Sequence, residues 1–236
     1  MDGKSIGTQA LSGQRFDLIR AVQDQAYGAL YSVLPGRERI DYIGTVPLSA
    51  ITAGALNSTH WVNAVVAAIF EAADIKSKLL GSLPRHAKVK GMPVGEFLHL
   101  RQGGYIHLKH LLPVGDTAAR SYQAIAADML GLPYIWGGTG FVGVDCSGLV
   151  QSALAAVGVD APRDADQQEA ALGQVVDFAE RQSGDLLFWP GHVGIVTDVD
   201  HLLHANAFHM CVALELVETA VARIGAVRTV KRLSEL

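Results

Sequence analysis

The sequence predicts an α+β fold in which a small β-barrel precedes a unit of helices followed by an antiparallel sheet. Two observations predict it. Short apolar runs separated by turn residues fill positions 60–112, which is typical of a small barrel. Two helical stretches then come before a series of strand-like runs. Helices followed by strands indicate an α+β fold rather than an alternating βαβ sheet.

Length, composition and charge exclude several classes of protein. The chain has 236 residues, of which 50% are apolar and 18% charged, so it can bury a core and is not disordered. Its two cysteines cannot form a disulfide-dense scaffold or a Cys-rich zinc site. The net charge of -4 argues against a non-specific nucleic-acid binder. Residues 42–70 are uncharged but interrupted by polar residues, and the N-terminal residues do not resemble a secretory signal. We therefore expect a soluble, cytoplasmic protein with no membrane association.

The two halves of the chain differ in charge. Residues 1–115 contain 12 basic and 8 acidic residues, whereas residues 116–236 contain 7 and 15. This change predicts a domain boundary near residue 115. We predict an N-terminal extension of uncertain structure (1–57), a barrel (58–114) and a second unit (116–236), with a linker over 112–115. Within the extension, residues 21–34 have helix-like spacing that ends at Pro35-Gly36.

Turn residues divide the barrel region into five expected strands. Breaks are expected at Pro84, at 91–93 and at Gly103-Gly104. The expected strands cover residues 61–70, 76–83, 86–92, 96–102 and 104–112. Three histidines, His99, His107 and His110, lie along one edge. Exposed strand positions account for them better than a metal site does, so no metal is predicted.

The second unit is expected to begin with two helices. Asp116 or Thr117 would cap a helix over 118–130, and Asp145 would cap a helix over 146–157 that ends at Gly158. The remaining expected elements are strands over 185–189, 192–199, 201–207 and 211–217, a helix over 218–224 and a strand over 226–233. The stretch 138–143 matches the GxGxxG dinucleotide motif, but the preceding segment is too short for a buried strand, so no cofactor is predicted.

A cysteine at a helix start is the first candidate for chemistry. Cys146 follows the expected cap Asp145, and the positive end of the helix favours a thiolate. Such a setting can bring a thiol from about 8.5 into the range of roughly 3.5–7.5 that reactive cysteines show. The alternative is an inert buried cysteine, which is what we expect of Cys211 within its apolar strand.

Two histidines supply the partners that a nucleophile needs. His192 follows a tight turn at the start of an apolar strand, from which it can reach a helix start packed on the sheet edge. His204 lies on the next strand and could orient the ring of His192. Together with Cys146 they form a candidate catalytic triad.

Three separated blocks resemble the NlpC family of papain-like cysteine peptidases. They are DCSGLVQ (145–151), GDLLFWPGHVGIV (184–196) and LLHANAF (202–208), in the family's order and spacing. The resemblance covers residues 116–236 and implies a papain-like fold with Cys146 as nucleophile, His192 as general base and His204 as the orienting residue. Residues 60–112 resemble, on GYIHLKHL (104–111) and strand rhythm, the bacterial SH3-like domain that often precedes this peptidase.

The resemblance also implies a substrate. The family cleaves bacterial cell-wall peptides, typically between γ-D-glutamate and a diamino acid, and one branch acts on short murein peptides with a free L-alanine amine. Asp145, Ser147 and Asp164 are then candidates to bind the ammonium group, since a buried ammonium needs a carboxylate partner. Tyr134 would line the site and Tyr105 would close it. The sequence leaves the diamino acid and the oligomeric state undefined.

Two other functions stay open. A relative with the same nucleophile could be an amidase or an acyltransferase, which would need a wide apolar groove. A non-catalytic binder of wall fragments would have lost a catalytic residue, whereas Cys146, His192 and His204 are all present.

Overall fold

The computed structural model describes residues 6–34, 38–54, 57–140 and 142–234. The chain divides into two compact units: one covers Ala10–Ala118, and the other joins Ala119–Leu236 to the segment that ends at Gln9. Both contain antiparallel sheets and the second also contains α-helices, which confirms the α+β class. Within the described ranges, no helix is both long enough and apolar enough to cross a membrane.

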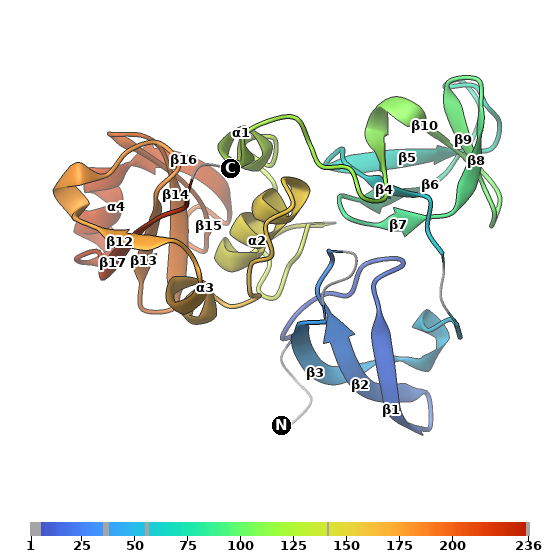
Figure 1. Cartoon of the computed structure of the whole chain (residues 1–236), viewed down its shortest axis with the longest axis horizontal. Helices are drawn as coiled ribbons and strands as arrows, with labels where there is room; N and C mark the ends of the chain where they lie inside the picture. Colours follow the sequence, from blue (N-terminus) through green and yellow to red (C-terminus); the bar gives the residue numbers. More distant parts are fainter. Residues whose placement is uncertain (1–5, 35–37, 55–56, 141, 235–236) are drawn as a thin grey trace. The chain divides into compact units, whose positions relative to one another are not determined.

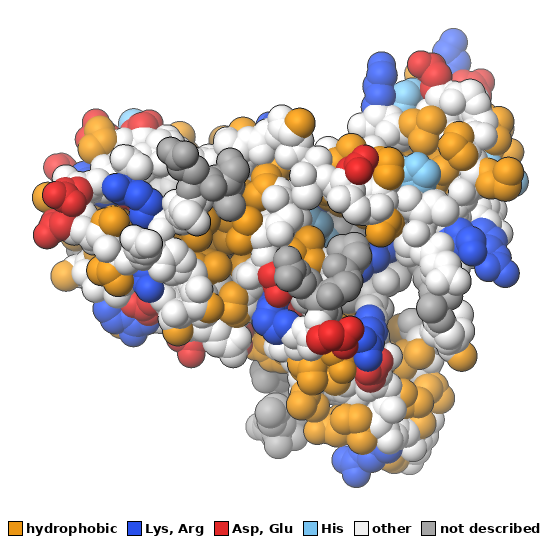
Figure 2. All heavy atoms as spheres, in the orientation of Figure 1, with side chains coloured by type: hydrophobic (Ala, Val, Ile, Leu, Met, Phe, Trp, Pro, Cys, Tyr) orange, Lys and Arg blue, Asp and Glu red, His pale blue; other side chains and the backbone are white. Residues whose placement is uncertain are grey.

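The first unit begins with a three-stranded antiparallel sheet, not with the helix expected over 21–34 (Figure 1). Its strands are β1 (Phe16–Val22), β2 (Gln25–Tyr31) and β3 (Ile40–Pro47). The prediction was wrong because Gln23 adopts a positive φ of 56° and the chain reverses there, so that Val22 pairs with Gln25. The expected break at Pro35-Gly36 lies outside the described residues. Apolar side chains are exposed on this sheet (Figure 2), among them Leu18, Ile19, Val22 and Ile43.

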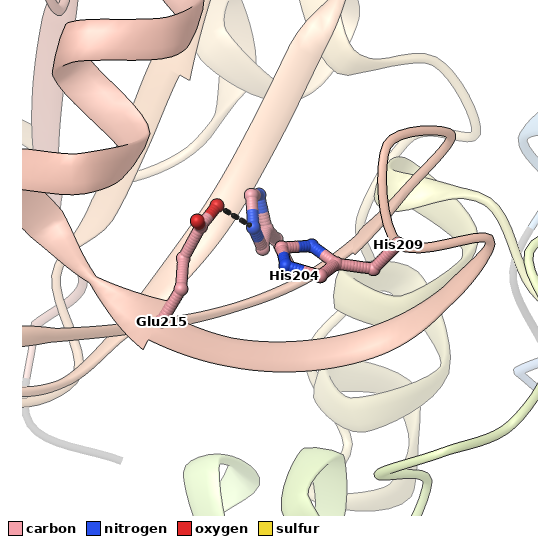
Figure 3. Close-up of side chains that lie close together, drawn as sticks. All are labelled: His204, His209 and Glu215. Atoms are coloured by element: carbon pink, nitrogen blue, oxygen red, sulfur yellow. Dashed lines mark ion pairs between the residues drawn. The ribbon is translucent and has the colours of Figure 1, made fainter.

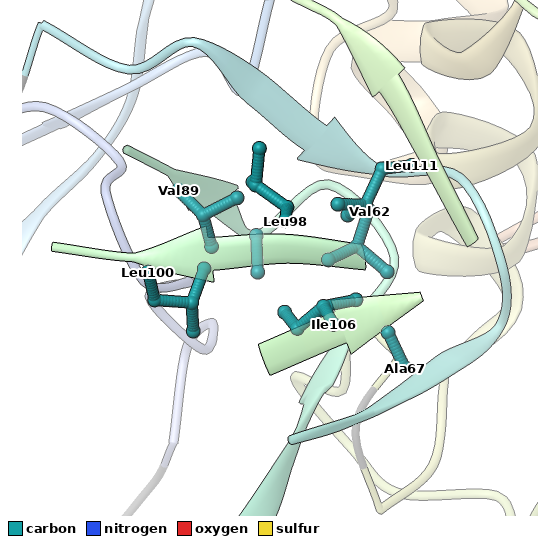
Figure 4. Close-up of a cluster of buried hydrophobic side chains, with 8 residues drawn as sticks. Val62, Ala67, Val89, Leu98, Leu100, Ile106 and Leu111 are labelled. Carbon is teal, nitrogen blue, oxygen red and sulfur yellow. The ribbon is translucent and has the colours of Figure 1, made fainter. Parts of the chain in front are cut away.

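The rest of the first unit consists of two sheets that enclose one apolar core. One sheet has the order β6-β5-β10-β9-β8 and the other the order β11-β4-β7. Their bounds are β4 (His60–Val62), β5 (Val66–Phe70), β6 (Leu79–Pro84), β7 (Lys88–Val89), β8 (Gly91–Val94), β9 (Phe97–Leu100), β10 (Tyr105–His107) and β11 (Leu111–Pro113). Figure 4 shows the shared core, which includes Val62, Leu98, Leu100 and Ile106.

The described strands do not close into the barrel that the sequence suggested. The run expected as one strand over 61–70 is interrupted between β4 and β5, and these two halves join different sheets. Two open sheets therefore replace the closed barrel. Pro93 was expected to end a strand but lies within β8, because β8 is at the edge of its sheet and an edge strand tolerates a missing N–H. The expected linker over 112–115 begins inside β11, which pairs with β4.

The second unit has a six-stranded sheet with the order β12-β17-β13-β14-β15-β16. Figure 1 shows its central strands between helices α4 and α2. The bounds are α1 (Tyr122–Ala127), α2 (Cys146–Ala156), α3 (Ala165–Ala171), β12 (Gln174–Val176), β13 (Leu186–Trp189), β14 (His192–Asp198), β15 (His201–Asn206), β16 (Cys211–Leu216), α4 (Val217–Ile224) and β17 (Thr229–Arg232). Every strand expected after residue 184 is confirmed, and so is the helix before the last strand. The elements α3 and β12 were not predicted from the sequence.

The first helix is shorter than expected and begins later. Its N-cap is Ser121, whose hydroxyl accepts a hydrogen bond from the backbone N–H of Ala124, rather than Asp116 or Thr117. Ser121 is favoured as a cap because its backbone is extended and its short side chain reaches the first free N–H groups. The second helix is confirmed from Cys146, and all of its residues are buried.

Candidate active site

The thiol of Cys146 lies at the start of α2. The carboxylate of Asp145 accepts a hydrogen bond from the backbone N–H of Gly148 at 2.7 Å, which confirms the predicted cap. The Sγ atom lies 4.0 Å from the carbonyl oxygen of Gly191, and the backbone N–H of Val193 hydrogen-bonds to it. The thiol is therefore in contact with the backbone on both sides of His192.

The two candidate histidines are hydrogen-bonded to each other. The Nε2 atom of His192, on β14, lies 2.8 Å from the Nδ1 atom of His204 on β15. Gly194 allows this approach, because a Cβ there would meet the Leu202 side chain at 2.8 Å and the Cβ of His204 at 3.1 Å. Since Nε2 of His192 is engaged by His204, Nδ1 is the ring nitrogen left to exchange a proton with a thiol.

The resting charges differ from the predicted ones. Burial raises the pKa of the Cys146 thiol to about 11, and the charge of Asp145 acts in the same direction. Burial also lowers the pKa of His192 to about 4, with the charges of His204 and Arg223 adding to the effect. The predicted lowering of the thiol pKa by the helix start is therefore overturned by desolvation. At neutral pH the site holds a neutral thiol beside a neutral imidazole.

This charge state predicts how alkylation of Cys146 depends on pH. Because the raised pKa keeps the thiol protonated near pH 7, the thiolate fraction should grow about tenfold per pH unit, up to the pKa of about 11. We expect the rate of carboxamidomethylation by iodoacetamide, followed by mass spectrometry, to keep rising above pH 9. Alkylation of Cys211 in the same sample serves as the internal reference. A plateau below pH 7 would instead indicate a resting thiolate and contradict this charge state.

A buried ion pair holds the cap in place. Arg163 is 1% exposed, and its Nη2 and Nη1 atoms donate to the two carboxylate oxygens of Asp145 at 2.6 and 2.9 Å. The same guanidinium donates to the hydroxyl of Ser147 at 2.9 Å. Thr8 accepts from its Nε at 3.0 Å, which ties the N-terminal segment to this unit. No role was predicted for Arg163, since nothing in an 18-residue separation from Asp145 indicates a contact.

The structure brings some of the predicted substrate residues together. The hydroxyl of Tyr134 lies close enough to Cys146 and Asp145 for their charges to act on it, and burial raises its pKa to about 12. Arg163 donates hydrogen bonds to both Asp145 and Ser147, so these two residues are weaker candidates for binding the ammonium group of a substrate. Asp164 is half-buried at the N-cap of α3. Tyr105 belongs to the other unit, where its ring stacks on His99. Binding by these residues stays a prediction.

Two further charged residues extend the histidine pair and were missed. The carboxylate of Glu215, on β16, lies 2.7 Å from the Nε2 atom of His204. Arg223, on α4, forms an ion pair with the same carboxylate. A glutamate alternating with apolar residues reads from sequence as an exposed strand position, so no signal separated it from a surface residue.

Comparisons with known proteins agree with the geometry of this unit. Residues 131–223 match the model of the NlpC/P60 family. The chain is 40% identical over 111 residues to a γ-D-glutamyl-L-lysine dipeptidyl-peptidase of Bacillus subtilis (strain 168), and 42% identical over 94 residues to a probable endopeptidase of Corynebacterium glutamicum. The relatives named in these matches are peptidases, and residues 131–223 are similar in sequence to their NlpC/P60 domains.

These matches cover part of each protein. They span 43% and 37% of this chain and 37% and 44% of the two relatives, so the chain spans less than half the length of these curated relatives. A crystal structure of an NlpC/P60 family protein from Bacillus cereus ATCC 10987 resembles the fold over 96% of this chain and 81% of its own, with a TM-score of 0.79 and 23% identity. That likeness shows the fold, and the SH3-like character of residues 58–114 stays a prediction.

Proposed function

We propose that this chain is a cysteine peptidase that hydrolyses the γ-D-glutamyl–diamino acid bond of cell-wall peptides. One observation carries the proposal: a thiol at the start of a buried helix contacts the turn that bears His192, and His192 is hydrogen-bonded to His204. A nucleophile, a base and a group that orients the base are the parts that covalent acyl transfer needs. The names of the relatives support the choice of a peptide substrate.

The reaction begins with a proton transfer because the resting site is neutral. His192 accepts the thiol proton at Nδ1 as Sγ of Cys146 attacks the γ-D-glutamyl carbonyl carbon, and the carbonyl becomes a tetrahedral oxyanion. The backbone N–H of Cys146, at the free end of the helix, would stabilise that oxyanion. The C–N bond then breaks, the imidazolium protonates the leaving amine, and a thioester remains. His192 next activates a water molecule that hydrolyses the thioester and regenerates the thiol.

The substrate that we propose is a short murein peptide with a free N-terminal L-alanine. Its ammonium group needs a carboxylate, and we propose Asp164 for this role, since Asp145 is buried in an ion pair with Arg163. Tyr134 would line the site near the thiol, and residues 58–114 would form an SH3-like domain. A cytoplasmic location and a role in murein recycling belong to the same proposal.

A pair of matched peptides tests the substrate. The protein is incubated with L-Ala-γ-D-Glu-meso-diaminopimelate and with its N-acetylated form, and the products are followed by mass spectrometry. We expect release of diaminopimelate from the free-amine peptide only, because acetylation removes the charge that Asp164 would bind. Cleavage of both peptides would contradict the amine requirement and indicate a general endopeptidase. Cleavage of neither would contradict the proposed substrate.

A further inference from the structure

Glu215 contacts the side of the His204 ring that faces away from His192. In the register of β15 and β16, His204 pairs with Ala213, so Glu215 lies two positions along on the same face of the sheet. Figure 3 shows the Glu215 carboxylate directed at this ring, with Oε1 2.7 Å from Nε2. The His204 ring is completely buried. Among the described residues Nε2 has no aligned hydrogen-bond partner, and the Glu215 carboxylate contacts it at ion-pair distance.

The carboxylate is itself held in place. The side chain of Glu215 is 9% exposed, and the guanidinium of Arg223 donates a hydrogen bond to its Oε1. Arg223 also lies over the ring of Phe208, at 4.5 Å from the centroid. A carboxylate that is paired with a guanidinium accepts hydrogen bonds and donates none. Neutral His204 must then place its single proton on the nitrogen that faces Glu215.

We propose that Glu215 is a positioning residue that holds His204 in the tautomer with its proton on Nε2. The tautomer of His204 then determines the tautomer of His192. Nδ1 of His204 then carries a lone pair and accepts the Nε2–H of His192, which leaves Nδ1 of His192 free to accept the thiol proton. The opposite tautomer of His204 would reverse both donors and place a proton on Nδ1 of His192, where a base needs a lone pair. The inference rests on the proposed role of His192 as the base.

His209 lies near His204 and Glu215, but a metal site built from these three residues explains the position of the carboxylate less well than the ion pair with Arg223 does. The possible metal-ligand atoms of His204, His209 and Glu215 lie within 4.8 Å of one another, which is close enough to hold a metal ion. However, the positive charge beside Glu215 is already supplied by Arg223, and His209 shares the Oδ1 of Asn206 through its Nδ1 at 3.0 Å. The charged and titratable groups around His204 are thus His192 from β14, His209 from the turn after β15, Glu215 from β16 and Arg223 from α4.

The tautomer of His204 can be measured without any substrate. Long-range ¹H–¹⁵N correlation spectra of the wild-type protein at neutral pH report which ring nitrogen carries the proton. Burial lowers the pKa of His204 to about 3, so the ring is neutral under these conditions. We expect the proton on Nε2 of both His204 and His192. A proton on Nδ1 of His204 in the wild-type protein would overturn the inference, whatever bond the enzyme cleaves.

A matched pair of variants tests the effect on catalysis. In Glu215→Met the acceptor is lost at similar side-chain volume, and Glu218→Met makes the same change at an exposed position at the start of α4. We expect Glu215→Met to lower kcat on the order of 10²-fold with KM nearly unchanged, and its spectra to show His204 protonated on Nδ1. Glu218→Met should keep the wild-type kcat and tautomer. An unchanged kcat and tautomer in folded Glu215→Met would overturn the inference.

Discussion

Replacing Cys146 with alanine is expected to lower kcat by at least about 10⁴-fold on any peptide that the wild-type protein cleaves. The reason is chemical: alanine offers no sulfur to form the thioester, and the fixed groups of the site cannot replace the covalent step. The thermal midpoint should change little, since only one buried sulfur atom is removed from a helix that packs along its whole length. Single-turnover assays and melting curves check both expectations.

The other cysteine provides the matched control. Cys211 is half-buried on β16, and the change to alanine there removes the same atom far from the helix start in sequence. Cys211→Ala should therefore keep the wild-type kcat, and its remaining thiol should still be alkylated by iodoacetamide. Activity of Cys146→Ala close to that of Cys211→Ala would refute the proposal of thiol chemistry at Cys146.

The sequence predicted the second unit better than the first, for a physical reason. After residue 184 each strand is a short apolar run between clear turn signals, and β13, β14, β15 and β16 pair in sequence order in one sheet. In the first unit part of the pairing is non-local: β4 pairs with β7 and β11, and β5 pairs with β10 as well as with its neighbour β6. Apolar patterning sets which residues are buried, but it does not say which of two sheets a strand joins. The open sheets were missed for that reason.

The residues of the candidate site also fall into a group that local sequence signals predict and a group that they do not. Cys146, its cap Asp145 and the two histidines could be predicted, because each depends on a local signal such as a helix start or a turn before a strand. The ion pairs Arg163–Asp145 and Glu215–Arg223 could not, because each forms only after α3 or α4 has packed against its neighbours. The thiol pKa was missed for the same reason, since it depends on the depth of burial rather than on the helix end.

Replacing Arg163 with methionine is expected to lower the free energy of unfolding by roughly 3–5 kcal/mol. The substitution leaves the carboxylate of Asp145 buried at the start of α2 without its cation, and the hydroxyl of Ser147 also loses a partner. Urea denaturation measures the change. The matched control is Arg228→Met, which breaks an ion pair with Glu169 at a position where the arginine side chain is 45% exposed. That variant should lose less than about 1 kcal/mol, because an exposed pair is screened by water.

A second substitution separates the charge from the packing. In Arg163→Met with Asp145→Asn, the start of α2 no longer holds the unpaired carboxylate of Asp145, and the amide oxygen of asparagine can still accept the hydrogen bond from the N–H of Gly148. The double variant should therefore be more stable than Arg163→Met alone, although the second change removes another native hydrogen-bonding group. A double variant that loses the sum of the two single effects would show that the residues are not coupled. The coupling also affects catalysis, because Asp145, which is paired with Arg163, caps the helix that begins at Cys146.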